Sequence, residues 1–431
     1  MCAALVREQT DERGVFVISA DGCQRQRHDH ESGSYRVFRE QMRTSSTKWV
    51  LCGVLLAGAC SMEAAAAAAP HYLITNDDRT GNFYDNSLTF YTVEADGRLT
   101  LTQQVLTGVT GAQGGYFPAN RVVAFNTAGN QCVFASDGAT GRIDGVDVNT
   151  LTLSGHAQGS ADDTGLSNGV GLALNTQYLY ASFTDSSTIG TFQIEPSCGL
   201  SFVGDVTVGG LRGGTVDGMA VHGDMLVATY GDGSIESFNL ASVIPVSNGD
   251  KQNSTGSRSG GSYPSAVDIT KDGRFALFGD SSTSTMIEVS DISSGRLSTT
   301  VVYQSPSSIN SSNIMLSPDE KLLYISNTQG DRITAVLFDS DSGKLLTGCV
   351  SGELRGYSSA WSYLGGMGLA SPTGNGGGVY VAEFGAPSSI AEIRVNVANG
   401  ECSLSEAPGS PIPDLNSGGL LSVATFPPRS F

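Results

Sequence analysis

A strand pattern that recurs seven times is the feature that most constrains how this 431-residue chain can fold. Each copy is a short, largely apolar strand, and the copies are YLITN at 72, CVFAS at 132, LYASF at 179, LVATY at 226, ALFGD at 276, LYISN at 323 and VYVAE at 379. Successive copies begin 47 to 60 residues apart, and three of the six intervals are 47. A four-stranded propeller blade needs about 40 to 50 residues. The sequence therefore predicts an all-β, seven-bladed β-propeller over residues 70–431.

The two ends of the repeat region predict how the ring closes. The first repeat has no innermost strand of its own, because residues 72–76 already match the second-strand pattern. The last strand, residues 420–426 (LLSVATF), has no repeat of its own to join. We expect residues 420–426 to pair beside residues 72–76 as the innermost strand of blade one, because this closure leaves no sheet edge unpaired.

Composition supports a turn-rich β protein and excludes polyanionic partners. Only 15% of the residues are charged and 55 are Gly, which is unlike a helical protein. The formal net charge is −18, and the sequence has no Lys/Arg cluster that would overcome this field. Nucleic acid and anionic membrane surfaces are therefore not expected partners.

Residues 1–69 are predicted to be an N-terminal extension and a signal peptide, with the signal over 42–69. A cationic segment at 42–48 precedes an apolar run of 11 residues at 49–59 and an alanine tract at 64–69. This order is typical of a secretory signal, and 11 residues are too few to cross a bilayer. The chain is expected to be secreted or periplasmic. Cleavage near Ala69 and lipid anchoring at Cys60, which follows LAGA, remain alternatives.

Four of the eight cysteines lie beyond the predicted signal, at 132, 198, 349 and 402. They have no C-x-x-C spacing, so the sequence does not predict a zinc site. Cys349 and Cys402 lie near the outer edges of consecutive blades and are candidates for pairing in an exported protein. Cys132 lies inside a strand and is interpreted as a buried thiol.

One repeat resembles a known family of propellers. Residues 316–345 (LSPDEKLLYISNTQGDRITAVLFDSDSGKL) resemble the repeat of the lactonase family of seven-bladed propellers, which includes 6-phosphogluconolactonase and 3-carboxymuconate cyclase. The family's innermost strands often open with Pro-Arg-His. Here the corresponding residues in blades two, five and six are 120–122 (NRV), 264–266 (PSA) and 311–313 (SSN), so only Arg121 keeps the basic residue.

The predicted fold indicates where a site would lie. The beginnings of the innermost strands and the ends of the second strands meet around one mouth of the central channel. Polar residues at these positions are Arg121, Asp217, Ser265, Ser312, Asn76, Ser136, Asp280, Asn327 and Glu383. For an anionic lactone, Arg121, Asp217 and Glu383 are the candidate catalytic residues, since an Arg can hold a carboxylate and an acid can move a proton. Arg212, Asn327 and Trp361 are candidate ligand-binding residues. No metal and no cofactor is expected.

Two functions remain open from the sequence. The first is an exported lactonase-like hydrolase that acts on a lactone or sugar ligand at the channel mouth. The second is a non-catalytic propeller that binds a ligand or an envelope protein through its loops, as repeat scaffolds commonly do.

Overall fold

A computed structural model describes residues 71–77, 86–109, 120–160, 170–254, 264–280, 286–298, 301–304, 311–327, 332–352, 354–355, 363–370, 378–384, 388–399, 401–413 and 422–428. All of them belong to one compact unit, Ala69–Phe431. The predicted signal segment, Cys60 and Trp361 lie outside the described residues. The described part of the chain includes no helix with the length and hydropathy needed to cross a membrane.

Each of the first four sheets runs from an innermost strand at the channel to an outermost strand at the rim. Blade one contains β30 (Ser422–Phe426), β1 (Tyr72–Asn76), β2 (Ser87–Val93) and β3 (Leu99–Leu106). Blade two contains β4 (Val122–Thr127), β5 (Asn130–Asp137), β6 (Arg142–Asp147) and β7 (Thr152–Gln158). Blade three contains β8 (Val170–Leu174), β9 (Tyr178–Phe183), β10 (Thr188–Ile194) and β11 (Leu200–Thr207). Blade four contains β12 (Val216–His222), β13 (Met225–Tyr230), β14 (Ser234–Asn239) and two short outer strands, β15 (Val246–Ser247) and β16 (Gln252–Asn253).

The remaining three sheets follow the same order. Blade five contains β17 (Pro264–Ile269), β18 (Phe275–Asp280), β19 (Met286–Asp291) and β20 (Val301–Gln304). Blade six contains β21 (Ser311–Leu316), β22 (Leu322–Asn327), β23 (Arg332–Asp339) and β24 (Lys344–Val350). Blade seven contains β25 (Tyr363–Ala370), β26 (Gly378–Phe384), β27 (Ser389–Ala398), β28 (Glu401–Glu406) and the short β29 (Ile412–Pro413). All seven predicted second strands are thus present, and each is the second strand of its sheet.

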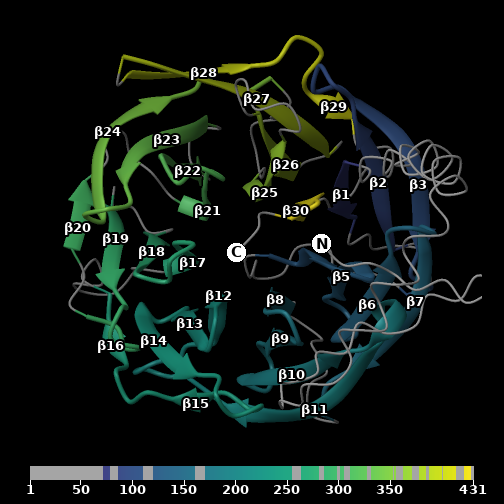
Figure 1. The fold of residues 1–431 in the computed structure, drawn as a ribbon, viewed down its shortest axis with the longest axis vertical. Helices are drawn as coiled ribbons and strands as arrows, with labels where there is room; N and C mark the ends of the chain where they lie inside the picture. The colour runs from purple at the N-terminus through teal and green to yellow at the C-terminus, as the bar shows by residue number, and fades with distance from the viewer. Residues whose placement is uncertain are drawn as a thin grey trace, which may run out of the picture. The chain divides into compact units, whose positions relative to one another are not determined.

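The innermost strands form a closed ring. β30, β4, β8, β12, β17, β21 and β25 contact one another in this order, and β25 contacts β30 again (Figure 1). β30 pairs with β1 in antiparallel register, with Tyr72 opposite Phe426 and Asn76 opposite Ser422. The prediction that the C-terminal strand completes blade one is confirmed.

Seven hydrophobic cores lie between consecutive blades, and they explain why the second strands are apolar on both faces. Successive residues of a strand point to opposite faces of the sheet. Leu73 accordingly packs in the core between blades seven and one, and Ile74 packs in the core between blades one and two. Ala276 and Leu277 divide in the same way between the two cores that flank blade five. Each blade is therefore buried on both sides, which favours nearly continuous apolar strands over strict alternation.

Two disulfides connect neighbouring blades, and one of them corrects the sequence interpretation. Cys349 on β24 is bonded to Cys402 on β28, as the sequence suggested. Cys132 is not a free buried thiol, because it is bonded to Cys198 in the short 3-10 helix η2 (Pro196–Cys198) of blade three. η2 approaches blade two so closely that a Cβ at Gly145 would overlap the Cys198 carbonyl oxygen. The Cys132–Cys198 disulfide joins residues 66 positions apart and left no local signal.

Candidate functional site

The candidate site lies on the channel-mouth face, which is the end of the propeller where the innermost strands begin and the second strands end. The strand registers place Asn76 opposite Ser422, Asn327 opposite Ser311, and Glu383 opposite Leu364. In blade two, the Ser136 N–H donates to the Arg121 carbonyl at 2.9 Å. These pairings place the predicted residues at the same end of their sheets.

A β-bulge marks the beginning of the innermost strand in blades four to seven. The register shifts between Val216 and Gly218, between Pro264 and Ala266, between Ser311 and Asn313, and between Leu364 and Met367. The extra residues in the first three are Asp217, Ser265 and Ser312, which are predicted members of the channel-mouth face. A bulge releases its extra residue from the ladder and redirects its side chain, and bulges are frequent next to active sites. These three residues therefore share one structural position.

In blades one and two, the polar residues of this face connect the blades. Asn76 donates from Nδ2 to the Ser136 carbonyl at 2.8 Å, and Ser136 donates from Oγ to the Val170 carbonyl of blade three at 2.6 Å. Arg121 lies beside them and is only 1% exposed. Asn76 and Ser136 thus have a structural role in the packing of consecutive blades.

Asn327 and Glu383 make polar contacts within their own blades. Asn327 donates from Nδ2 to the Thr334 hydroxyl at 2.9 Å. The Ser389 hydroxyl donates to the Glu383 carboxylate. Both side chains are buried.

Blade four brings two of the predicted site residues, Asp217 and Arg212, to one hairpin. The Asp217 carboxylate lies against Gly231, where an added Cβ would be 3.1 Å from Asp217 Oδ2. The next residue, Asp232, accepts a hydrogen bond from the backbone N–H of Arg212 at 2.5 Å. The Arg212 guanidinium donates to the Asp232 carbonyl at 3.4 Å and is exposed to solvent. An acid and a cation predicted separately thus both lie at the β13–β14 turn, and the turn bonds only the cation.

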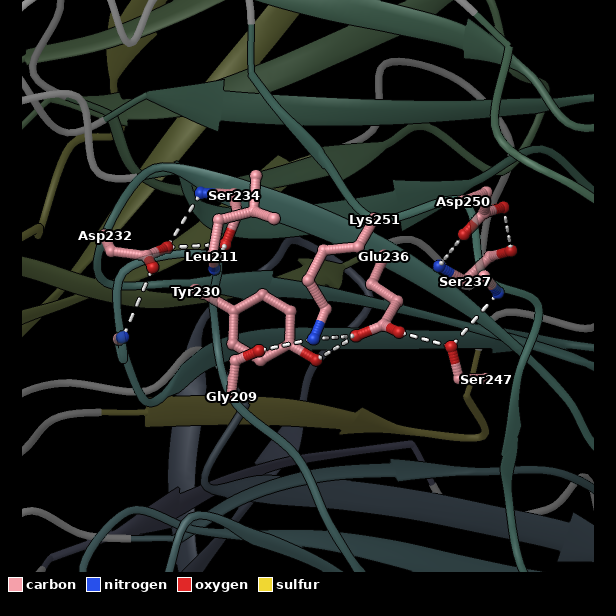
Figure 2. Close-up of polar contacts among 12 residues, drawn as sticks. Gly209, Leu211, Tyr230, Asp232, Ser234, Glu236, Ser237, Ser247, Asp250 and Lys251 are labelled. Carbon is pink, nitrogen blue, oxygen red and sulfur yellow. Dashed lines mark hydrogen bonds and ion pairs between the residues drawn. The ribbon is translucent and has the colours of Figure 1, made fainter.

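Sequence reasoning missed Asp232, which organises this part of blade four. Its carboxylate accepts hydrogen bonds from the Ser234 N–H at 3.0 Å, from the Ser234 hydroxyl at 2.5 Å and from the Gly214 N–H at 3.3 Å (Figure 2). The signal that could have identified it is the glycine-rich run 209–214 (GGLRGG) followed by Gly-Asp-Gly at 231–233. A Cβ at Gly210 or Gly214 would overlap Asp232, so these glycines let the loop close around the carboxylate.

The neighbouring carboxylates Asp217 and Asp232 have pKa values shifted in opposite directions. Burial and, to a smaller extent, the charge of Asp232 raise the pKa of Asp217 to about 7. Partial burial acts to raise the pKa of Asp232 as well. The hydrogen bonds from Ser234, Arg212 and Gly214 outweigh that effect and hold the pKa of Asp232 below its ordinary value. Near neutral pH, Asp232 is therefore ionised, whereas Asp217 is present in both its protonated and its ionised form.

A second polar cluster supports the base of the 209–214 loop. Tyr230 donates from its hydroxyl to Glu236 at 2.7 Å, and Lys251 Nζ lies 3.0 Å from Glu236 Oε2 (Figure 2). Lys251 also donates to the Gly209 carbonyl at 2.5 Å, so the cluster reaches the first residue of the loop. Burial, followed by the charge of Glu236, raises the pKa of Tyr230, which keeps its phenol protonated as a donor.

Replacing Asp217 by Asn is expected to change the pH dependence of stability. The ordinary Asp pKa is 3.8, and the folded protein raises it to about 7. The stability contributed by the protonated carboxyl is therefore fully present below pH 3.8 and is lost as the pH rises through 7. Asn cannot ionise, so D217N should match the wild type near pH 4 and exceed it above pH 7 by up to about 4 kcal/mol. Thermal unfolding followed by circular dichroism from pH 4 to 8 measures this difference, and a difference that is independent of pH would contradict it.

Comparison with known proteins identifies the fold. No protein-family profile matches the sequence, and no curated protein resembles it in sequence. Among solved structures, a candidate 6-phosphogluconolactonase from Bacteroides fragilis aligns over 84% of this chain and 99% of its own, with 15% identity and a TM-score of 0.58. A functionally unknown protein from Desulfotomaculum acetoxidans aligns over 83% of this chain and 99% of its own, with 11% identity and a TM-score of 0.57. At these identities the likeness concerns the fold alone. The chain has the lactonase-like seven-bladed propeller fold.

Proposed function

We propose that this protein is an exported lactone hydrolase with its site on the channel-mouth face of blade four. The observation that carries the proposal is the Asp217–Asp232 pair beside the exposed Arg212. Two neighbouring carboxylates with pKa values shifted apart are a recurrent arrangement in acid–base catalysis. A base with a pKa of about 7 is well matched to neutral conditions, because it is available in both protonation states.

In this mechanism, water attacks the lactone carbonyl carbon, and ionised Asp217 removes a proton from that water. The tetrahedral intermediate then expels the ring oxygen, which takes the same proton back from Asp217. The ring C–O bond breaks, a new C–O bond to the water oxygen forms, and the product is the open hydroxy acid. Arg212 binds an anionic substituent or the developing oxyanion.

The other residues predicted from the sequence keep their proposed roles. Arg121 and Glu383 remain candidate catalytic residues, and Asn327 and Trp361 remain candidate ligand-binding residues. Arg121 is almost fully buried and Arg212 is exposed, so Arg212 is better placed to meet a ligand that arrives from solvent.

Export is supported by the two disulfides, because such bonds persist in oxidising compartments. A secreted or periplasmic enzyme does not meet phosphogluconolactone, which is made in the cytoplasm. We therefore place the substrate among extracellular or periplasmic lactones of sugars or aromatic acids.

The test is hydrolysis of a panel of sugar and aromatic lactones by the purified protein. Loss of a general acid–base group typically costs about 10²- to 10⁴-fold in rate, so D217N should lower kcat/KM by that order. Arg121→Ala and Glu383→Ala should also reduce the rate sharply if their assignments hold. Arg98→Ala, which removes an exposed arginine paired with Asp96, is the control and should be unchanged. Full activity in D217N would exclude the blade-four mechanism.

A non-catalytic binding propeller is the second candidate. It is favoured by the hydrogen bonds that engage Asn76 and Ser136 between blades and Asn327 within its own blade, since such residues are less free to serve chemistry. This candidate predicts a protein that is inert toward every lactone in the panel yet retains a defined ligand or envelope protein in a pull-down.

A further inference from the structure

The loop at residues 209–214 connects blade three to blade four and carries an exposed Leu-Arg pair at its tip. Leu211 is 50% exposed, and Arg212 is exposed beside it. Six residues that include four glycines would ordinarily sample many conformations, because Gly adopts both signs of φ. An arginine on such a loop would lose conformational entropy each time it bound a ligand.

In this protein, one acidic side chain holds the loop in a single shape. The Asp232 carboxylate accepts the backbone N–H groups of Arg212 at the loop tip at 2.5 Å and of Gly214, two residues later, at 3.3 Å. The loop also closes on itself, since the Gly210 N–H donates to the Gly214 carbonyl at 2.8 Å. Gly213 has a φ of +87°, a conformation that glycine adopts without strain.

Asp232 is itself fixed in position. The N–H and hydroxyl of Ser234 donate to its Oδ1 at 3.0 and 2.5 Å, so the carboxylate cannot rotate away from the loop (Figure 2). Ser234 Oγ also accepts the Leu211 N–H at 3.1 Å. The turn and the loop tip are thus one hydrogen-bonded unit.

We propose that Asp232 is a positioning residue of the blade-four site, which holds Arg212 against the hairpin that Asp217 contacts and so preorganises the arginine for an anionic ligand. This inference rests on the proposed function and names the residue that positions Arg212. The charged groups on the hairpin and loop beside Asp217 are Asp232 and Arg212, and Lys251 and Glu236 form an ion pair at the base of the loop. Of these, Asp232 is the one whose charge acts on Asp217.

The first test measures the loop without any substrate. Trypsin cleaves after arginine, and cleavage requires an extended, mobile backbone, so the Arg212–Gly213 bond should resist digestion in the folded protein. In Asp232→Ala this bond should be cut at least about tenfold faster, as quantified by mass spectrometry of the new N-terminus at Gly213. Asp291→Ala is the matched control, because Asp291 accepts the N–H and hydroxyl of the serine two residues later, Ser293, as Asp232 does with Ser234. Equal cleavage in Asp232→Ala and in the wild type would overturn the inference.

The second test separates positioning from a purely structural role. If Asp232 acts through Arg212, then Asp232→Ala and Arg212→Ala should each raise KM for an anionic lactone by about tenfold, and the double variant should raise it no further. Additive effects would overturn the inference.

If the wild type hydrolyses no lactone, the proposed function fails. A third measurement then still tests the position of Asp232, because it needs no substrate. The isosteric Asp232→Asn removes the charge, so the Asp217 titration midpoint, taken from the stability difference between proteins with Asp and Asn at 217, should move to lower pH. An unchanged midpoint in Asp232→Asn would overturn the placement of Asp232 beside Asp217, and unchanged tryptic cleavage in Asp232→Ala would by itself overturn the inference independently of any activity.

Discussion

A chain that ends at residue 421 is expected to lose its cooperative unfolding transition and to associate through exposed strand edges. β30 is the innermost strand of blade one, and its removal leaves β1 unpaired on the channel side. Val423 packs in the core between blades seven and one, and Phe426 packs in the core between blades one and two. One deletion therefore opens two cores and a sheet edge. Thermal scans by circular dichroism and size-exclusion chromatography measure the loss.

A point variant gives a graded form of the same result. Phe426 is 1% exposed, so Phe426→Ala should lower the free energy of unfolding by about 3 to 5 kcal/mol. Phe202→Ala on the outermost strand β11 is the matched control and should cost much less, because Phe202 is 39% exposed. Addition of a peptide covering residues 420–431 should partly restore the transition in the truncated chain. A truncated protein that melts like the full chain would refute closure by β30.

Removal of both disulfides is expected to produce the second largest loss of stability. The bonds span 66 and 53 residues, and loop-closure entropy for loops of this length corresponds to about 4 kcal/mol each. We expect Cys132→Ala with Cys198→Ala, and Cys349→Ala with Cys402→Ala, each to lower the denaturation midpoint in guanidinium. The quadruple variant should lose the sum, because the pairs lie in different blade interfaces.

Reduction supplies the control for the disulfide variants. With a dithiol reductant in the denaturant series, the wild type should unfold at the lower midpoint of the quadruple variant. If the oxidised wild type and the variants had the same midpoint, these bonds would have no part in holding the blades together.

The closing strand and the blade count were predictable because both depend on patterns local to the chain. Residues 323–327 were expected as a strand and lie in β22, and residues 420–426 were expected beside residues 72–76 and include β30. The β-bulges were not predicted as such. The residues they release, Asp217 among them, were nevertheless identified because they occupy repeated positions at the channel mouth.

The sequence by itself determined the repeat, since apolar strands with a period near 47 residues can bury both of their faces only by packing blade against blade. The tertiary structure decided the Cys132–Cys198 bond, which depends on the approach of η2 to a glycine in another blade. It also decided the pKa of Asp217 and the position of Arg212 in the blade-four site. Sequence reasoning named Asp217 and Arg212 separately, but the pKa of Asp217 depends on burial, and the position of Arg212 depends on the Asp232 carboxylate, which lies 20 residues away in the chain. Burial and long-range hydrogen bonds arise only when the chain has folded, because they are properties of the space around a residue rather than of its neighbours in sequence.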